Sequence, residues 1–162
     1  MPACADFGIV GLGQIGGGLA MQALDKGRSV AGYDVEGVDE SLRQAGLTEI
    51  RQLEEFQEKL RSPRIIFLYV PAGPVVDEVL DELVPELEPG DIVVDGGNSY
   101  WRDSLLRHER LASRNIRFVD LGTSGGIEGA RHGACFMAGG DEEALEQVEP
   151  ILKSLMVNDG HI

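Results

Sequence analysis

The sequence predicts an α/β fold of the Rossmann type, with a doubly wound, mainly parallel sheet and helices on both faces. Two observations lead to this prediction. Short apolar segments alternate with segments of helical periodicity, which is the rhythm of βαβ units. In addition, the glycine-rich turn G-L-G-Q-I-G at residues 11–16 follows the first apolar segment and opens the first helical one. At 162 residues, the chain is expected to form a single domain over residues 1–162.

The first half of the chain holds four predicted strands and three predicted helices. The strands are expected at residues 7–11, 29–34, 47–50 and 64–70, and the helices at residues 14–26, 38–45 and 52–60. Gly27 stands where a glycine commonly ends a helix, and Ser62 and Pro63 stop the third helix. The segment R-I-I-F-L-Y-V at residues 64–70 is nearly all apolar, which is typical of a parallel strand covered on both faces.

The second half continues the alternation. Pro74 can start a helix, because its missing N–H costs nothing at the first helical position. Further strands are expected at residues 92–95, 116–121 and 134–137. Between the first two of these strands, Trp101, Leu105, His108 and Ala112 trace one face of a helix. Asp141 is expected to cap a last helix, and Pro150 to kink or restart it.

The composition excludes several classes of partner. The chain carries 28 acidic and 14 basic residues, a net charge of −14, which argues against nucleic acid and anionic membranes. No apolar run approaches a membrane span, and the first residues lack the pattern of a signal peptide, so a cytoplasmic protein is expected. Cys4 and Cys135 stand in no metal-binding or CxxC pattern and are expected to be reduced thiols. No metal site is predicted.

The turn at residues 11–16 has the form of a dinucleotide-binding loop. Gly11 permits the tight turn, Gly13 lets backbone amides approach a pyrophosphate, and Gly16 lets the helix pack close to the sheet. The positive end of the helix dipole can hold an anion that the overall charge repels. The predicted cofactor-binding residues here are Gly11, Leu12, Gly13, Gln14, Ile15 and Gly16. A plain turn with spare glycines is the alternative.

Asp34 ends the second predicted strand, eighteen residues beyond Gly16. An acidic side chain at this place accepts hydrogen bonds from the ribose hydroxyls of the adenosine half. A 2′-phosphate would meet like charge there, and Val35 and Glu36 supply no arginine to offset it. The predicted cofactor is therefore NAD in preference to NADP. The alternative is a solvated aspartate at a strand end.

Three further glycine-bearing stretches each follow a predicted strand. They are V-P-A-G at residues 70–73, D-G-G-N-S at residues 95–99 and T-S-G-G at residues 123–126. In a parallel sheet such ends lie on one edge, where ligands bind near the switch in strand order. Asn98 offers an amide that can donate and accept, although Asn98 or Ser99 could instead serve only as the N-cap of the next helix.

These motifs, in this order and spacing, closely resemble the N-terminal domain of 6-phosphogluconate dehydrogenase. The resemblance extends through G-A-R-H-G-A-C-F-M-A-G-G at residues 129–140 and covers essentially the whole chain. D-G-G-N-S is its most specific part, since the wider β-hydroxyacid dehydrogenase family typically has a D-x-S-T type segment there. The resemblance implies that the nicotinamide side of the cofactor is bound by Val70, Pro71, Ala72 and Asn98. It also implies that the sugar-acid substrate is bound by Asn98, Ser124, Gly125 and Gly126.

The reaction implied by the resemblance is the NAD(P)-dependent oxidative decarboxylation of 6-phosphogluconate to ribulose 5-phosphate and CO2, a step of gluconate metabolism in the pentose phosphate pathway. The family's base is a lysine in a G-H-x-x-K type segment, followed by a glutamate acid, and neither is present here. The three lysines, Lys26, Lys59 and Lys153, lie in helical patterns away from the glycine-bearing edge. The family's C-terminal helical domain, through which relatives form homo-oligomers, is also absent. We therefore expect residues 1–162 to bind NAD without turnover, and to be monomeric.

Other interpretations remain open on the sequence alone. The chain could come from a relative acting on another 3-hydroxy acid, such as 3-hydroxyisobutyrate or a tartronate semialdehyde. It could also be a stand-alone dinucleotide-binding module without chemistry. Arg131 and His132 lie close in sequence to T-S-G-G and could approach a substrate, but a flexible loop or a structural role is the favoured interpretation.

Overall fold

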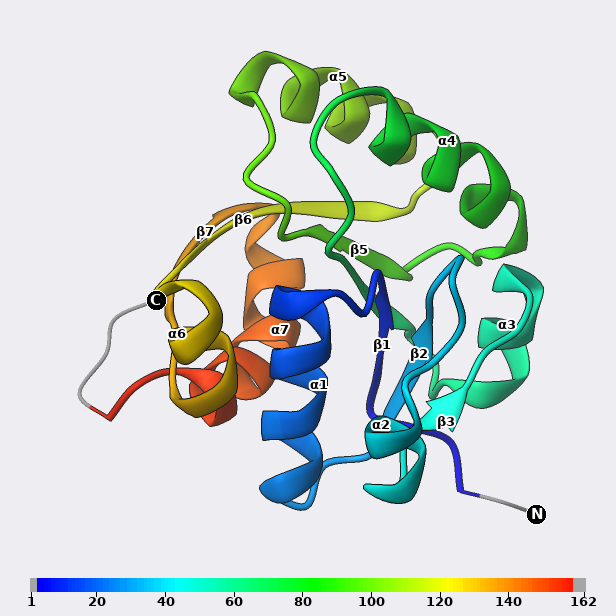
Figure 1. The fold of residues 1–162 in the computed structure, drawn as a ribbon. Coiled ribbons are helices and arrows are strands. Elements are labelled where there is room, and N and C mark those ends of the chain that lie inside the picture. The colour runs from blue at the N-terminus through cyan, green and yellow to red at the C-terminus, as the bar shows by residue number, and fades with distance from the viewer. Residues whose placement is uncertain (1–2, 159–162) are drawn as a thin grey trace.

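A computed structural model describes residues 3–158, and these form one sheet with helices on both faces (Figure 1). The strand order is β3-β2-β1-β4-β5-β6-β7. Neighbouring strands from β3 to β6 run parallel, whereas β7 pairs with β6 in the antiparallel sense. The direction of strand order therefore reverses between β1 and β4. The predicted doubly wound, mainly parallel fold is confirmed.

The elements alternate along the chain as predicted. The strands are β1 Phe7–Val10, β2 Val30–Tyr33, β3 Thr48–Glu49, β4 Ile65–Leu68, β5 Ile92–Asp95, β6 Arg117–Ser124 and β7 Cys135–Gly140. The α-helices are α1 Gln14–Asp25, α2 Glu40–Gln44, α3 Phe56–Lys59, α4 Pro74–Leu83, α5 Trp101–Ala112, α6 Gly126–His132 and α7 Glu142–Leu155. Two short 3-10 helices, Leu53–Glu55 and Val84–Glu86, precede α3 and follow α4.

Each face of the sheet carries its own apolar core. On one face, α1, α6 and α7 pack over strand residues such as Ile9, Phe67 and Val94. On the opposite face, α3, α4 and α5 pack over strand residues such as Ile66 and Val93. Successive strand side chains point to opposite faces, so the strands of a sheet covered on both sides become apolar throughout. Among residues 3–158, no helix is long and apolar enough to cross a bilayer.

The predicted face of α5 is wrong. Trp101 and Leu105 are more than half exposed, and the helix instead buries Ser104, Arg107 and Leu111. The spacing of these three residues is helical, but two of them are polar, so a search for apolar periodicity passes over them. Arg107 can be buried because acidic side chains lie around it.

Other departures concern the last third of the chain. Thr123 and Ser124 belong to β6, and the segment after them forms α6, where no helix was predicted. Pro150 does not restart α7, which runs unbroken from Glu142 to Leu155. Asp141 occupies the N-cap position of α7 but makes no capping bond, because its carboxylate instead lies 3.1 Å from Nε2 of His108 on α5.

Candidate cofactor cleft

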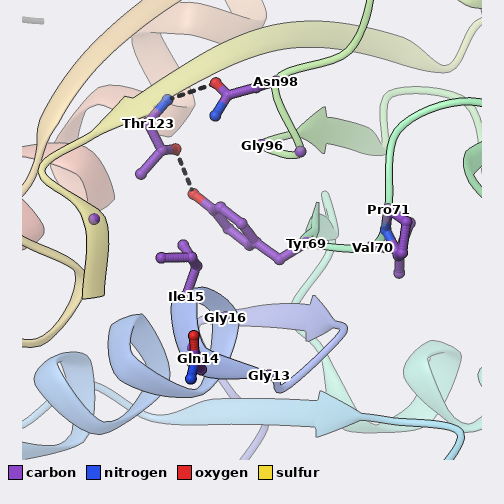
Figure 2. A pocket seen from close by; sticks show the side chains of 12 residues that line it. Gly13, Gln14, Ile15, Gly16, Tyr69, Val70, Pro71, Gly96, Asn98 and Thr123 are labelled. Carbon is purple, nitrogen blue, oxygen red and sulfur yellow. Dashed lines mark hydrogen bonds between the residues drawn. The ribbon is translucent and has the colours of Figure 1, made fainter.

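The carboxyl ends of four parallel strands surround one cleft of about 460 Å3, located where the strand order reverses (Figure 2). Its lining combines the loop after β1 and the start of α1, the loop after β4, the loop after β5, and residues at the end of β6. The lining residues are Gly13, Gln14, Ile15, Gly16, Tyr69, Val70, Pro71, Gly96, Gly97, Asn98, Thr123 and Gly126. The predicted convergence of the glycine-bearing stretches on one edge is therefore confirmed.

The N-terminus of α1 opens into this cleft without a side chain of its own. Gly13 is the N-cap residue and makes no side-chain capping bond. A methyl group built on Gly13 would meet nothing within 4 Å, so the space beside it is open. The first amides of a helix have no partners within the helix, and its dipole favours an anion there. The loop thus fits the pyrophosphate of a dinucleotide, the role predicted for it.

Gly16 lies deeper and serves the packing of the loop. A methyl group on Gly16 would overlap the carbonyl oxygen of Gly11 and lie 3.1 Å from Cβ of Tyr69. Gly11 is itself buried beneath the backbone of Tyr69 and does not line the cleft. Gly11 and Gly16 therefore shape the turn from inside, while Gly13 faces the open space.

Asp34 lies just beyond β2 and is bonded to the glycine loop. Its Oδ2 accepts a hydrogen bond from the amide of Leu12 at 2.8 Å, and its Oδ1 accepts one from the amide of Glu36 at 2.9 Å. Each carboxylate oxygen can accept a second bond. Asp34 remains partly exposed and lies outside the lining of the cleft, beside the loop that forms one wall.

Asn98 is held with its amide in a defined orientation. Its backbone adopts a left-handed conformation at φ 54°, and its Oδ1 accepts a hydrogen bond from the amide of Thr123 at 3.3 Å (Figure 2). Ser99 bonds to Asp95 at 2.5 Å, and the N-cap of α5 is Tyr100, without a side-chain cap. The alternative in which Asn98 or Ser99 caps this helix is therefore wrong. The Nδ2 group of Asn98 remains to donate toward the cleft.

Tyr69 is a lining residue that the sequence motifs did not predict, and Thr123 is another. Its hydroxyl lies 3.0 Å from Oγ1 of Thr123, and its ring lies against Gly96, where a methyl group would come within 2.5 Å of Cζ (Figure 2). Burial raises the pKa of the Tyr69 phenol above its ordinary value of 10.0, so the hydroxyl keeps its proton even at alkaline pH. The available signal was a hydroxyl at the end of an otherwise apolar strand, directly before V-P-A-G.

Three further predicted site residues lie outside the lining of the cleft. Ala72 is exposed in the loop after β4, Ser124 is exposed at the end of β6, and Gly125 is the N-cap of α6. Gly126, the first residue of α6, does line the cleft. The side chain of Arg131 does not reach the cleft. It pairs at 2.6 Å with Asp25, the last residue of α1, whereas the cleft lies at the first residue of that helix.

Two carboxyl groups lie side by side behind the loop after β5. Asp95 and Asp120 are register partners on β5 and β6, and Asp95 is fully buried. Burial raises the pKa of the Asp120 carboxyl above its ordinary value of 3.8, and the charge of Asp95 raises it further. At neutral pH, an ionised Asp120 would therefore carry a cost in the folded state that the unfolded chain does not have.

Asp120→Asn should raise the melting temperature at pH 7 by a few degrees. Because the folded pKa is raised, the protonated Asp120 contributes stability below the unfolded value of 3.8, and this is lost as the pH rises through the folded pKa. Asparagine does not titrate, so the difference between variant and parent should shrink as the pH approaches 3.8. Thermal denaturation at several pH values checks this. An equal difference at every pH would contradict it.

Comparisons with known proteins indicate an NAD binding domain, in agreement with the dinucleotide-sized cleft described above. Residues 6–158 match the family described as the NAD binding domain of 6-phosphogluconate dehydrogenase. The chain is 43% identical over 158 residues to YqeC of Bacillus subtilis, covering 96% of this chain and 52% of that protein. It is 42% identical over 163 residues to the decarboxylating 6-phosphogluconate dehydrogenase of Schizosaccharomyces pombe, covering 97% of this chain and 33% of that enzyme.

A solved structure of Plasmodium falciparum 6-phosphogluconate dehydrogenase has the same fold. It matches with a TM-score of 0.88 and 31% identity, covering 96% of this chain and 35% of that one. That enzyme was solved in its apo form, in complex with its cofactor NADP+ and in complex with its substrate 6-phosphogluconate. The chain thus spans between a third and about half of the length of these relatives.

Proposed function

The chain belongs to the family of the NAD binding domain of 6-phosphogluconate dehydrogenase, and on that premise we propose that it is the NAD-binding part of a 6-phosphogluconate dehydrogenase. The reaction would be oxidation of the sugar acid by hydride transfer to the nicotinamide, followed by loss of CO2. The observation that carries the proposal is the meeting of the loops after β1, β4 and β5 around one cleft, with an open helix N-terminus in its wall.

The residues present fit a dinucleotide. The loop before α1 would hold the pyrophosphate, and Asp34, bonded to that loop, would accept from the adenosine ribose. Val70, Pro71 and Ala72 would bound the nicotinamide side. Nδ2 of Asn98 would donate toward cofactor and sugar acid, with Ser124, Gly125 and Gly126 on the substrate side. When bound, the nicotinamide supplies the hydride chemistry, while the chain binds and orients.

NAD is proposed as the preferred cofactor. A 2′-phosphate would approach the Asp34 carboxylate, and the neighbouring Val35 and Glu36 are exposed and carry no positive charge. A calorimetric titration with NAD and NADP distinguishes the two, and a clear preference for NADP would refute the role given to Asp34.

Turnover is proposed to need residues from outside this chain. A base poised near neutral pH must take the proton of the sugar hydroxyl. Lys26 bonds to Gln22 and to the carbonyl of Ser154, Lys153 pairs with Glu149 on α7, and no lysine among residues 3–158 lines the cleft. Residues 1–162 mixed with NAD and 6-phosphogluconate should form no NADH. NADH formation at a rate normal for such dehydrogenases would overturn this part of the proposal.

Gly13→Ala tests the binding role of the loop. The added methyl group meets no protein atom within 4 Å, so the melting temperature should stay unchanged. The same methyl group would occupy the space proposed for the pyrophosphate, and NAD affinity should fall by at least about tenfold, or about 1.4 kcal/mol. Calorimetry and thermal denaturation on the same preparation check both statements. Unchanged NAD affinity would place the pyrophosphate elsewhere.

A further inference from the structure

A buried arginine connects the loop after β4 with the loop after β5. These two loops form the side of the cleft opposite α1. Arg107 on α5 has only 3% of its side chain exposed. Its Nε and Nη2 donate to the two carboxylate oxygens of Asp77 on α4, each at 2.9 Å, and Nη2 also donates to the carbonyl of Gly73 at 3.0 Å. Gly73 ends the loop after β4, which carries Val70 and Pro71 into the cleft.

The remaining nitrogen of Arg107 faces the loop after β5. Nη1 lies 3.7 Å from Oδ2 of Asp95, and within the described residues it has no hydrogen-bond partner. Asp95 is fully buried and accepts from the amide of Gly97 at 3.1 Å and from the hydroxyl of Ser99 at 2.5 Å. A buried carboxylate needs a compensating charge, and the Arg107 guanidinium provides one.

The two loops are also in contact with each other. A methyl group on Gly97 would lie 2.7 Å from the carbonyl oxygen of Val70, so the two backbones approach closely beside the cleft. Arg107 is absent from the lining of the cleft itself. It therefore lies behind both loops, bonded to one and electrostatically paired with the carboxylate that organises the other.

We infer that Arg107 is a positioning residue: it fixes the loop after β4 relative to the loop after β5 and so sets the width of the nicotinamide side of the cleft. A lysine cannot replace it, because an ammonium group lacks the planar fork that reaches Asp77, Gly73 and Asp95 together. The inference rests on the proposed function for the identity of the ligand, but the tethering of the loops can be measured without any ligand.

Arg107→Lys, compared with Arg110→Lys, tests the inference. Arg110 pairs with Asp81 at 2.5 Å and joins the same two helices, but the pair is exposed and touches neither loop. Amide hydrogen exchange followed by mass spectrometry should show, in Arg107→Lys alone, at least about tenfold faster exchange in segments 69–76 and 95–101. Segment 8–19, which holds the glycine loop, should exchange as in the parent chain.

Ligand affinities provide the second measurement. Arg107→Lys should weaken NAD binding by about fivefold or more, while ADP-ribose, which lacks the nicotinamide, should bind as tightly as to the parent. The inference would be overturned if exchange in the two loops were unchanged, or if segment 8–19 accelerated by the same factor. It would also be overturned if the loops exchanged faster while the ratio of NAD affinity to ADP-ribose affinity stayed as in the parent. A parent chain that binds neither ligand would refute the proposed function, while the exchange measurement would still decide the tethering.

A milder variant covers the case in which Arg107→Lys does not fold. Asp77 has a side chain that is 49% exposed, and Asp77→Asn removes the charge that anchors the fork while Arg107 stays in place. The same two segments should exchange faster by a smaller factor, again without a change in segment 8–19. If the exchange rates of all three segments changed by the same factor relative to the parent, this variant would also contradict the inference.

Discussion

Gly16→Ala should lower the melting temperature of the chain by about 10 °C, through a loss of about 3 kcal/mol in the free energy of unfolding. The added methyl group would overlap the backbone carbonyl of Gly11 and press on Cβ of Tyr69. Neither neighbour can turn away, because Gly11 is buried and Tyr69 is bonded at its hydroxyl to Thr123. Thermal denaturation followed by circular dichroism measures the effect.

Gly13→Ala is the matched control for this substitution. It adds the same methyl group three residues earlier, where no atom lies within 4 Å. Stability should therefore separate the two variants, with Gly16→Ala destabilised and Gly13→Ala not. Equal melting temperatures for both variants would show that the loop can shift to admit a side chain at residue 16.

Asp34→Ala should weaken NAD binding by about 100-fold, or about 2.7 kcal/mol, because hydrogen bonds to a charged acceptor are worth about 1.5–3 kcal/mol each. The carboxylate is proposed to accept from the ribose, and it already holds the amide of Leu12 at 2.8 Å. Both interactions are lost in the variant. Calorimetric titration with NAD provides the measurement.

Glu36→Gln controls for the loss of one negative charge near the same loop. Glu36 is exposed, and its bond to Asp34 uses the backbone amide, which the substitution keeps. NAD affinity should change by less than about twofold in this variant, since exposed charges interact weakly across solvent. An Asp34→Ala variant that binds NAD as well as the parent would remove Asp34 from the cofactor site.

The fold could be predicted because local signals and tertiary structure agree in the first five strands. β5 has the predicted bounds, Ile92–Asp95, because an apolar run is followed directly by two glycines. α6 could not be predicted, since Gly126 and Gly129 in a seven-residue helix are poor helix formers. This helix is stabilised by tertiary packing, with Ala130 buried against Gly18 of α1.

The candidate site, like the fold, could be predicted only in part from the sequence. The glycine-bearing stretches could be found because each stands at the end of an apolar strand, and parallel strands bring such ends together. Tyr69 and Arg107 could not be found in this way. Tyr69 reads as one more residue of an apolar strand, and Arg107 becomes buried only because Asp77 and Asp95, distant in sequence, surround it.

The hydrogen bond from Leu12 to Asp34 has an evolutionary consequence. The carboxylate that is proposed to read the ribose also fastens the backbone of the phosphate loop. A lineage that exchanges Asp34 for a residue without a side-chain acceptor, such as alanine or arginine, must supply another acceptor for that amide at the same time. Replacements of Asp34 by such residues are therefore expected to be tolerated only together with a second, compensating change.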